Sequence, residues 1–91
     1  MRRRARSATL FTQGPTACAA CNWVRLWLER RGVAVHENDI TASPAARDEL
    51  LRLTNAELPV PTVLLPDGRV LVWPGPSTLK AVFGGGLRNS A

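Results

Sequence analysis

Short apolar runs alternate with segments of helical character along most of the chain, and this alternation limits the fold more than any other feature. Four apolar runs bounded by turn-forming residues predict strands: 8–12, 33–40, 62–65 and 69–73. Three other segments are predicted to be helices: 19–31, 43–54 and 77–83. The expected order of elements is therefore β-α-β-α-β-β-α.

General rules for how strands and helices are connected predict the architecture from this order. A strand–helix–strand unit has a right-handed crossover and parallel strands, so the first two strands should be parallel. Pro66-Asp67-Gly68 has the composition of a tight turn and predicts an antiparallel hairpin. The near-continuous apolar run over 62–65 is typical of a strand covered on both faces. We expect one α/β domain with a mixed four-stranded sheet and helices on both faces.

The helix patterns also predict which side chains face the core. In the first helix these are Cys21, Val24, Trp27 and Leu28, and Gly32 follows as a terminator. The second helix should begin at Ser43-Pro44, because serine caps free N–H groups and proline suits the first helical position. Its predicted inward residues are Ala46, Leu50, Leu51 and Leu53.

Cys18 and Cys21 are the only cysteines and stand at the start of the first predicted helix. A thiol there faces free N–H groups and the positive end of the helix dipole, which lowers the pKa of Cys18. Cys21, one turn further along, could attack a mixed disulfide formed by Cys18. The pattern predicts an exposed nucleophile, Cys18, and a more buried resolving thiol, Cys21, although a monothiol route would make Cys21 dispensable.

Metal binding is the competing interpretation of the cysteine pair. A structural zinc ion needs four ligands, and besides the two cysteines the chain offers only His36 as a nitrogen ligand. A zinc site within one chain is therefore disfavoured. A non-catalytic iron–sulfur cluster shared between two chains stays open.

The net charge of +5 comes mostly from one end of the chain. Four of the twelve basic residues lie within the first six positions, and the remaining eight face seven acidic residues, which leaves +1. This balance argues against nucleic-acid binding by the domain. The apolar run after the arginines is too short for a secretory signal or a membrane span. We expect a cytoplasmic protein with a basic disordered tail (1–7), one domain (8–83) and a flexible C-terminal tail (84–91).

Several linked features resemble the glutaredoxin family of the thioredoxin superfamily, over roughly residues 8–83. Gly32-Val33 and Asp39-Ile40 follow Cys21 at the spacing usual in that family, and Val60-Pro61-Thr62 resembles its cis-proline motif. Together with Pro66-Asp67-Gly68, these residues are most similar to the mycoredoxins, which work with mycothiol. The resemblance implies a thioredoxin fold with a cis peptide bond before Pro61.

The sequence also departs from the family pattern. Ala20 stands where a tyrosine is common, and Ala17 precedes the first cysteine where mycoredoxins tend to have tryptophan. Gln13 is the nearest counterpart of a family lysine. The segment from Trp73 to Ser77 replaces the Gly-Gly-[Ser/Thr]-Asp element that holds glutathione. The resemblance thus favours mycothiol over glutathione.

By this resemblance the protein is an oxidoreductase that reduces mixed disulfides between oxidised proteins and a low-molecular-weight thiol. No tightly bound cofactor is expected; mycothiol or glutathione would be the co-substrate, and the protein should be a monomer. The residues implied in binding the thiol substrate are Val60, Pro61, Thr62, Trp73, Ser77 and Gln13. The alternative is a protein-facing electron donor of the ribonucleotide-reductase type, recycled by the flavoprotein thioredoxin reductase.

The roles of three side chains stay open between two interpretations. Trp23 either borders the thiol groove or packs in the core. Arg25 either gives the site positive charge or pairs with Glu29 on a solvated helix face. Ser77 either receives a ligand carboxylate or caps the last helix. Two residues are expected to be structural only: His36 and Asp39.

Overall fold

The computed structural model describes residues 7–14, 17–55 and 58–84. The elements are β1 (Ser7–Thr12), α1 (Ala19–Arg30), β2 (Ala34–Asp39), α2 (Pro44–Thr54), β3 (Thr62–Leu64), β4 (Val70–Val72) and α3 (Pro76–Phe83). This is the predicted order, with ends displaced by a residue or two. The two predicted tails lie outside the described residues except for Ser7, which begins β1, and Gly84, which caps α3. Within the described ranges, no helix has the length and apolar character needed to cross a membrane.

The four strands form one mixed sheet in the order β2-β1-β3-β4. β1 is parallel to β2 with Thr12 opposite Asp39, and antiparallel to β3 with Phe11 opposite Thr62. The hairpin of β3 and β4 is antiparallel. Its turn contains Gly68 at a φ of +95°, a conformation that glycine adopts without steric cost. The predicted parallel unit and hairpin are thus both present.

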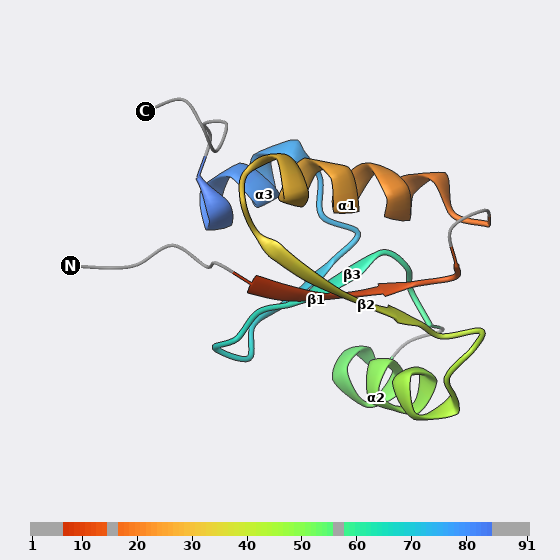
Figure 1. Ribbon diagram of the computed structural model, residues 1–91. Helices are drawn as coiled ribbons and strands as arrows, with labels where there is room; N and C mark the ends of the chain where they lie inside the picture. The colour runs from red at the N-terminus through yellow and green to blue at the C-terminus, as the bar shows by residue number, and fades with distance from the viewer. Residues whose placement is uncertain (1–6, 15–16, 56–57, 85–91) are drawn as a thin grey trace.

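Helices cover both faces of the sheet: α1 and α3 lie on one side and α2 on the other (Figure 1). Each side has its own apolar cluster. The α1/α3 side includes Leu10, Val24, Leu28, Val63 and Leu79, and the α2 side includes Phe11, Ile40, Ala46 and Leu50. Neighbouring residues of β1 therefore enter opposite clusters, because side chains alternate along a strand. The predicted α/β fold, a mixed sheet covered on both faces, is confirmed.

The predicted helix signals act as expected, with one exception among the inward residues. Ser43 is the N-cap of α2 and its hydroxyl accepts a bond from the Ala46 N–H at 3.1 Å, while Pro44 takes the first helical position. The expected inward position of Leu51 is wrong, since this side chain is 48% exposed. α2 is short and touches the sheet along one narrow stripe centred on Leu50, so its neighbour in sequence points away.

Candidate active site

The residues that the sequence singles out meet at one edge of the sheet. Thr12 ends β1, and the loop to Cys18 begins there. Because β3 is antiparallel to β1 and starts opposite Phe11, Pro61 lies at the same edge. Thr62 is opposite Val72, which brings Trp73 beside Pro61. Segments far apart in the sequence thus converge around the start of α1.

Cys18 and Cys21 are joined by a disulfide, and the pair forms the first turn of α1. Cys18 is the N-cap residue, with an extended backbone, and its sulfur accepts a hydrogen bond from the Cys21 N–H at 3.1 Å. A sulfur therefore takes the place of the oxygen of a serine or aspartate cap. Cys18 is 9% exposed and Cys21 2%. The predicted difference in burial is present, but Cys18 is less exposed than expected because its sulfur is held against the helix start in the oxidised pair.

The peptide bond between Val60 and Pro61 is cis, as the resemblance implies. Pro61 and Thr62 are buried, and the Thr62 hydroxyl donates to the carbonyl of Pro59 at 2.8 Å. The side chain of Thr62 is therefore used inside the loop and cannot contact a ligand directly. Val60 is half-buried and packs against the α2 cluster. The α2 cluster thus supports the loop that carries Pro61.

Trp73 is the most exposed large apolar side chain of the described ranges, at 68%. Its backbone has a φ of +53°, in the left-handed region that disfavours side chains larger than glycine. Its N–H donates to the carbonyl of Pro61 at 2.9 Å, which ties the end of β4 to the cis-proline loop. An exposed, strained aromatic residue without packing to justify it is typical of a functional site.

Trp23 is 43% exposed, so its interpretation as a core residue is wrong. Trp27, one turn later, is buried as predicted and lies edge-on to Phe83 at 6.4 Å between ring centroids. The guanidinium of Arg31 stacks on its ring at 3.6 Å. α1 therefore presents one tryptophan to the core and another to the surface.

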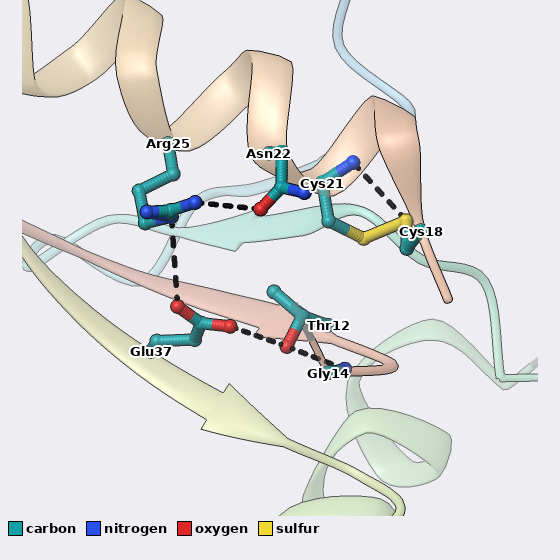
Figure 2. A network of polar contacts seen from close by, with 7 residues as sticks. All are labelled: Thr12, Gly14, Cys18, Cys21, Asn22, Arg25 and Glu37. Carbon is teal, nitrogen blue, oxygen red and sulfur yellow. Dashed lines mark hydrogen bonds and ion pairs between the residues drawn. A yellow bond between two sulfur atoms is a disulfide. The ribbon is translucent and has the colours of Figure 1, made fainter. Parts of the chain in front are cut away.

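A polar network runs from α1 across to the strands beneath the disulfide (Figure 2). Arg25 lies 3.7 Å from a carboxylate oxygen of Glu37 on β2 and donates to the Asn22 side chain at 2.6 Å. The other Glu37 oxygen accepts from the buried hydroxyl of Thr12 at 2.9 Å, which in turn accepts from the Gly14 N–H at 3.3 Å. The interpretation in which Arg25 pairs with Glu29 is therefore wrong.

Sequence reasoning missed Thr12 and Glu37. The only available signal for Glu37 was the two-residue alternation of β2, which puts it on the same face as Val35 and therefore toward α1. That an arginine of α1 would meet it depends on how the helix crosses the sheet. The sequence pattern alone indicates Glu29, one helical turn away, as a partner of Arg25.

Two other predicted binding residues lie at the surface. Gln13 is exposed in the loop after β1. Ser77 is exposed in the first turn of α3, whose N-cap is Gly75 with no side-chain cap bond, so capping by Ser77 is wrong. The helix begins one residue earlier than predicted, because Pro76 is itself suited to the first helical position.

Asp39 ends β2 at the same edge of the sheet. Hydrogen bonds from the side chain and the N–H of Thr41 hold the pKa of Asp39 below its ordinary value of 3.8. A Cβ atom on Gly14 would lie 3.2 Å from an oxygen of this carboxylate, and Gly14 has a φ of +90°. The loop that leads to Cys18 therefore passes close to a negative charge. His36 lies exposed on β2, opposite Thr9 and away from this edge.

Two features lie apart from the cysteine pair. A hollow of about 570 Å³ lies over the beginning of β1, at the opposite end of that strand, and is lined by residues such as Thr9, His36 and Pro66. None of the predicted site residues lines it. The described part of the chain contains no group of three or more histidine, cysteine or acidic side chains placed to hold a metal ion.

Comparison with solved structures identifies the same architecture elsewhere. The thioredoxin-like protein BC3987 has a TM-score of 0.72 and 29% identity, with coverage of 84% of this chain and 99% of that one. A mutant of the same protein gives a TM-score of 0.72 and 28% identity over 82% of this chain and 91% of that one. The fold is therefore thioredoxin-like.

Among curated proteins, the chain is similar to the global transcriptional regulator Spx of Streptococcus mutans, with 43% identity over 45 residues. That match covers 50% of this chain, and the chain spans only 31% of the regulator's length. The family model for glutaredoxin matches residues 8–70. That range contains the cysteine pair and the cis-proline motif, which fit a thiol–disulfide oxidoreductase. The chain belongs to the glutaredoxin family.

Proposed function

We propose that this protein reduces mixed disulfides between proteins and a low-molecular-weight thiol, with mycothiol as that thiol. The observation that carries the proposal is the position of Cys18 as N-cap of α1, with the Cys21 N–H directed at its sulfur at 3.1 Å. In the reduced protein the same N–H and the helix dipole stabilise a thiolate on Cys18. Cys21 is the more buried of the two sulfurs and suits the resolving role.

The reaction proceeds by two thiol–disulfide exchanges. The Cys18 thiolate attacks the sulfur of the small thiol in the mixed disulfide; that S–S bond breaks, and the protein substrate leaves as a thiolate that takes up a proton. Cys18 now carries the small thiol as a mixed disulfide. A second molecule of the same thiol, the reductant, attacks the sulfur of the bound small thiol; Cys18 leaves as a thiolate, and the two small thiols leave as their disulfide. In the dithiol route the Cys21 thiolate attacks the sulfur of Cys18 instead; the small thiol leaves as a thiolate, and the Cys18–Cys21 disulfide seen in the structure forms.

The predicted binding residues supply the surface around this exchange. The cis-proline loop offers the backbone of Val60 to an incoming extended segment, in the manner of an added strand. Pro61 lies within this loop, and the Thr62 hydroxyl holds the loop in shape by donating to the carbonyl of Pro59. Trp73 forms an aromatic wall beside Pro61. Gln13 and Ser77 are exposed polar groups on neighbouring segments and complete the proposed rim.

Substitution of each cysteine tests the proposal. Cys18→Ser should abolish turnover of a mycothiol-protein mixed disulfide, and an unchanged rate would refute the assignment. Cys21→Ser should retain turnover by the monothiol route and lose it by the dithiol route. Mass spectrometry of the Cys21→Ser protein after incubation with the substrate should find the small thiol attached to Cys18, which identifies nucleophile and partner together.

A protein-facing electron donor recycled by thioredoxin reductase is the second candidate. The observation that favours it is the likeness to thioredoxin-like structures over 84% of the chain, together with the exposed Trp73, which would suit a protein surface. Reduction of the disulfide by NADPH and thioredoxin reductase, without any reduction by mycothiol, would select this candidate.

A further inference from the structure

The segments that carry the predicted site residues have no charged side chain among their described residues. These segments are the loop before α1 and the cysteine pair, the cis-proline loop, and the stretch after β4: residues 13–14, 17–21, 58–62 and 73–78. A negative charge lies beside the first of these segments, because a Cβ atom on Gly14 would lie 3.2 Å from a carboxylate oxygen of Asp39. The exposed arginines of α2, Arg47 and Arg52, belong to the helix on the other face of the sheet from α1 (Figure 1). The described residues of these segments therefore offer no cationic side chain to an anionic substrate.

Arg25 is a cation on the cysteine side of α1 that could change this. It lies four residues after Cys21, about 6 Å along the helix axis, and Figure 2 shows its guanidinium on the same side of α1 as the disulfide. Its charge is already matched by Glu37 at 3.7 Å, and a bond to Asn22 holds it in place. Glu37 is fixed in turn by the Thr12 hydroxyl. The charge of Arg25 is thus already paired within the protein.

We infer that Glu37 is a specificity-determining residue, which masks the charge of Arg25 so that the site selects uncharged thiols over anionic ones. This inference rests on the proposed function and narrows its substrate class. Glutathione, with two carboxylates, falls outside this class. Mycothiol, a cysteine derivative without a carboxylate, falls within it. Glu37 acts through Arg25 and touches no reacting atom.

The test compares two substrates that differ by one charge. A neutral peptide with a single cysteine is joined in a mixed disulfide either to N-acetylcysteine, which is anionic, or to N-acetylcysteinamide, which is not. We expect Glu37→Gln to raise kcat/KM for the anionic substrate about threefold to tenfold relative to the neutral one, as the freed charge acts over several ångströms. The ratio of the two kcat/KM values is compared between variants, so differences in intrinsic reactivity between the two thiols cancel.

Two further variants complete the design. Arg25→Gln should change the ratio in the opposite direction, because it leaves the Glu37 carboxylate unbalanced. Glu29→Gln removes the same charge from the exposed side of α1, where Arg25 does not bind, and should leave the ratio close to that of the wild type. High salt should suppress the effect of Glu37→Gln, since the screening length falls from about 10 Å at 0.1 M to about 3 Å at 1 M.

The outcomes separate this inference from the proposed function. An unchanged ratio in Glu37→Gln, or equal losses on both substrates, would refute charge masking while Cys18-dependent turnover upheld the function. A change of the ratio in Glu29→Gln as large as that in Glu37→Gln would also refute it. So would a change of the ratio in the same direction in Glu37→Gln and Arg25→Gln. If Glu37→Gln does not fold, Arg25→Gln tests the inference instead: a ratio of kcat/KM, anionic over neutral, that does not fall would refute charge masking. Absence of Cys18-dependent turnover with both substrates would refute the proposed function itself, and the inference with it.

Discussion

Two variants, Trp73→Gly and Trp73→Ala, distinguish the free-energy cost of the left-handed backbone conformation at this position from the role of the indole side chain. Both variants remove the indole, which is 68% exposed, and both can keep the N–H bond to Pro61. They differ in how well they tolerate the φ of +53°. Alanine retains the clash between Cβ and the following carbonyl, whereas glycine has none.

The size of the difference follows from two opposing terms. Relief of the left-handed conformation favours glycine by about 1–2 kcal/mol, and its larger conformational freedom in the unfolded chain opposes this by about 0.5–1 kcal/mol. Trp73→Gly should therefore be more stable than Trp73→Ala by roughly 1 kcal/mol. For a domain of this size that difference raises Tm by about 4–8 °C.

Thermal unfolding of the two variants, with Trp23 as a control, tests this. Trp23 is exposed within α1, where the backbone is helical and glycine costs about 1 kcal/mol relative to alanine, so the order should reverse there. Turnover of a mixed disulfide should fall about tenfold in both Trp73 variants, the effect of losing an aromatic contact of about 1.4 kcal/mol. A Trp73→Ala protein as stable as Trp73→Gly would refute the backbone argument, and unchanged turnover would refute the aromatic wall.

Two further predictions concern the support of the site. Leu50→Ala should lower the free energy of unfolding by about 2–5 kcal/mol in a urea titration, because Leu50 is fully buried in the α2 cluster, while exposed Leu51→Ala should cost about 0.5 kcal/mol or less. Asp39 should contribute stability that is present above its unfolded pKa and is lost as the pH falls through its lowered folded pKa, since the bonds from Thr41 favour the carboxylate. Urea midpoints measured between pH 6 and pH 2 should therefore decline less in Asp39→Asn; an equal decline would contradict this.

The spans of the helices and strands could be predicted because their signals are local. Ser43-Pro44 starts α2 through bonds within its own first turn. Cys18 caps α1 in the same way, and the helical pattern that follows it predicts the place of the cysteine pair at a helix start. The cis bond before Pro61 was predicted from resemblance, since no local signal requires it.

The sequence-based predictions were wrong for two side chains whose surroundings depend on tertiary contacts. Arg25 has Glu29 one turn away in sequence, but it binds Glu37, which reaches it from the neighbouring strand. Leu51 has the composition of a core residue, yet α2 touches the sheet along a stripe too narrow to include it. Helical periodicity identifies an apolar face but does not determine how wide the contact with the sheet will be.

The order of elements, the two-sided burial of the sheet and the position of the cysteines at a helix start follow from local sequence patterns, because each depends on residues a few positions apart. What surrounds the disulfide depends instead on how the strands pair. The pairing of β1 with both β2 and β3 brings Glu37, Pro61 and Trp73 to that edge from three different segments. The charge and shape of the site depend on contacts between residues distant in sequence, and such contacts exist only once the sheet has formed.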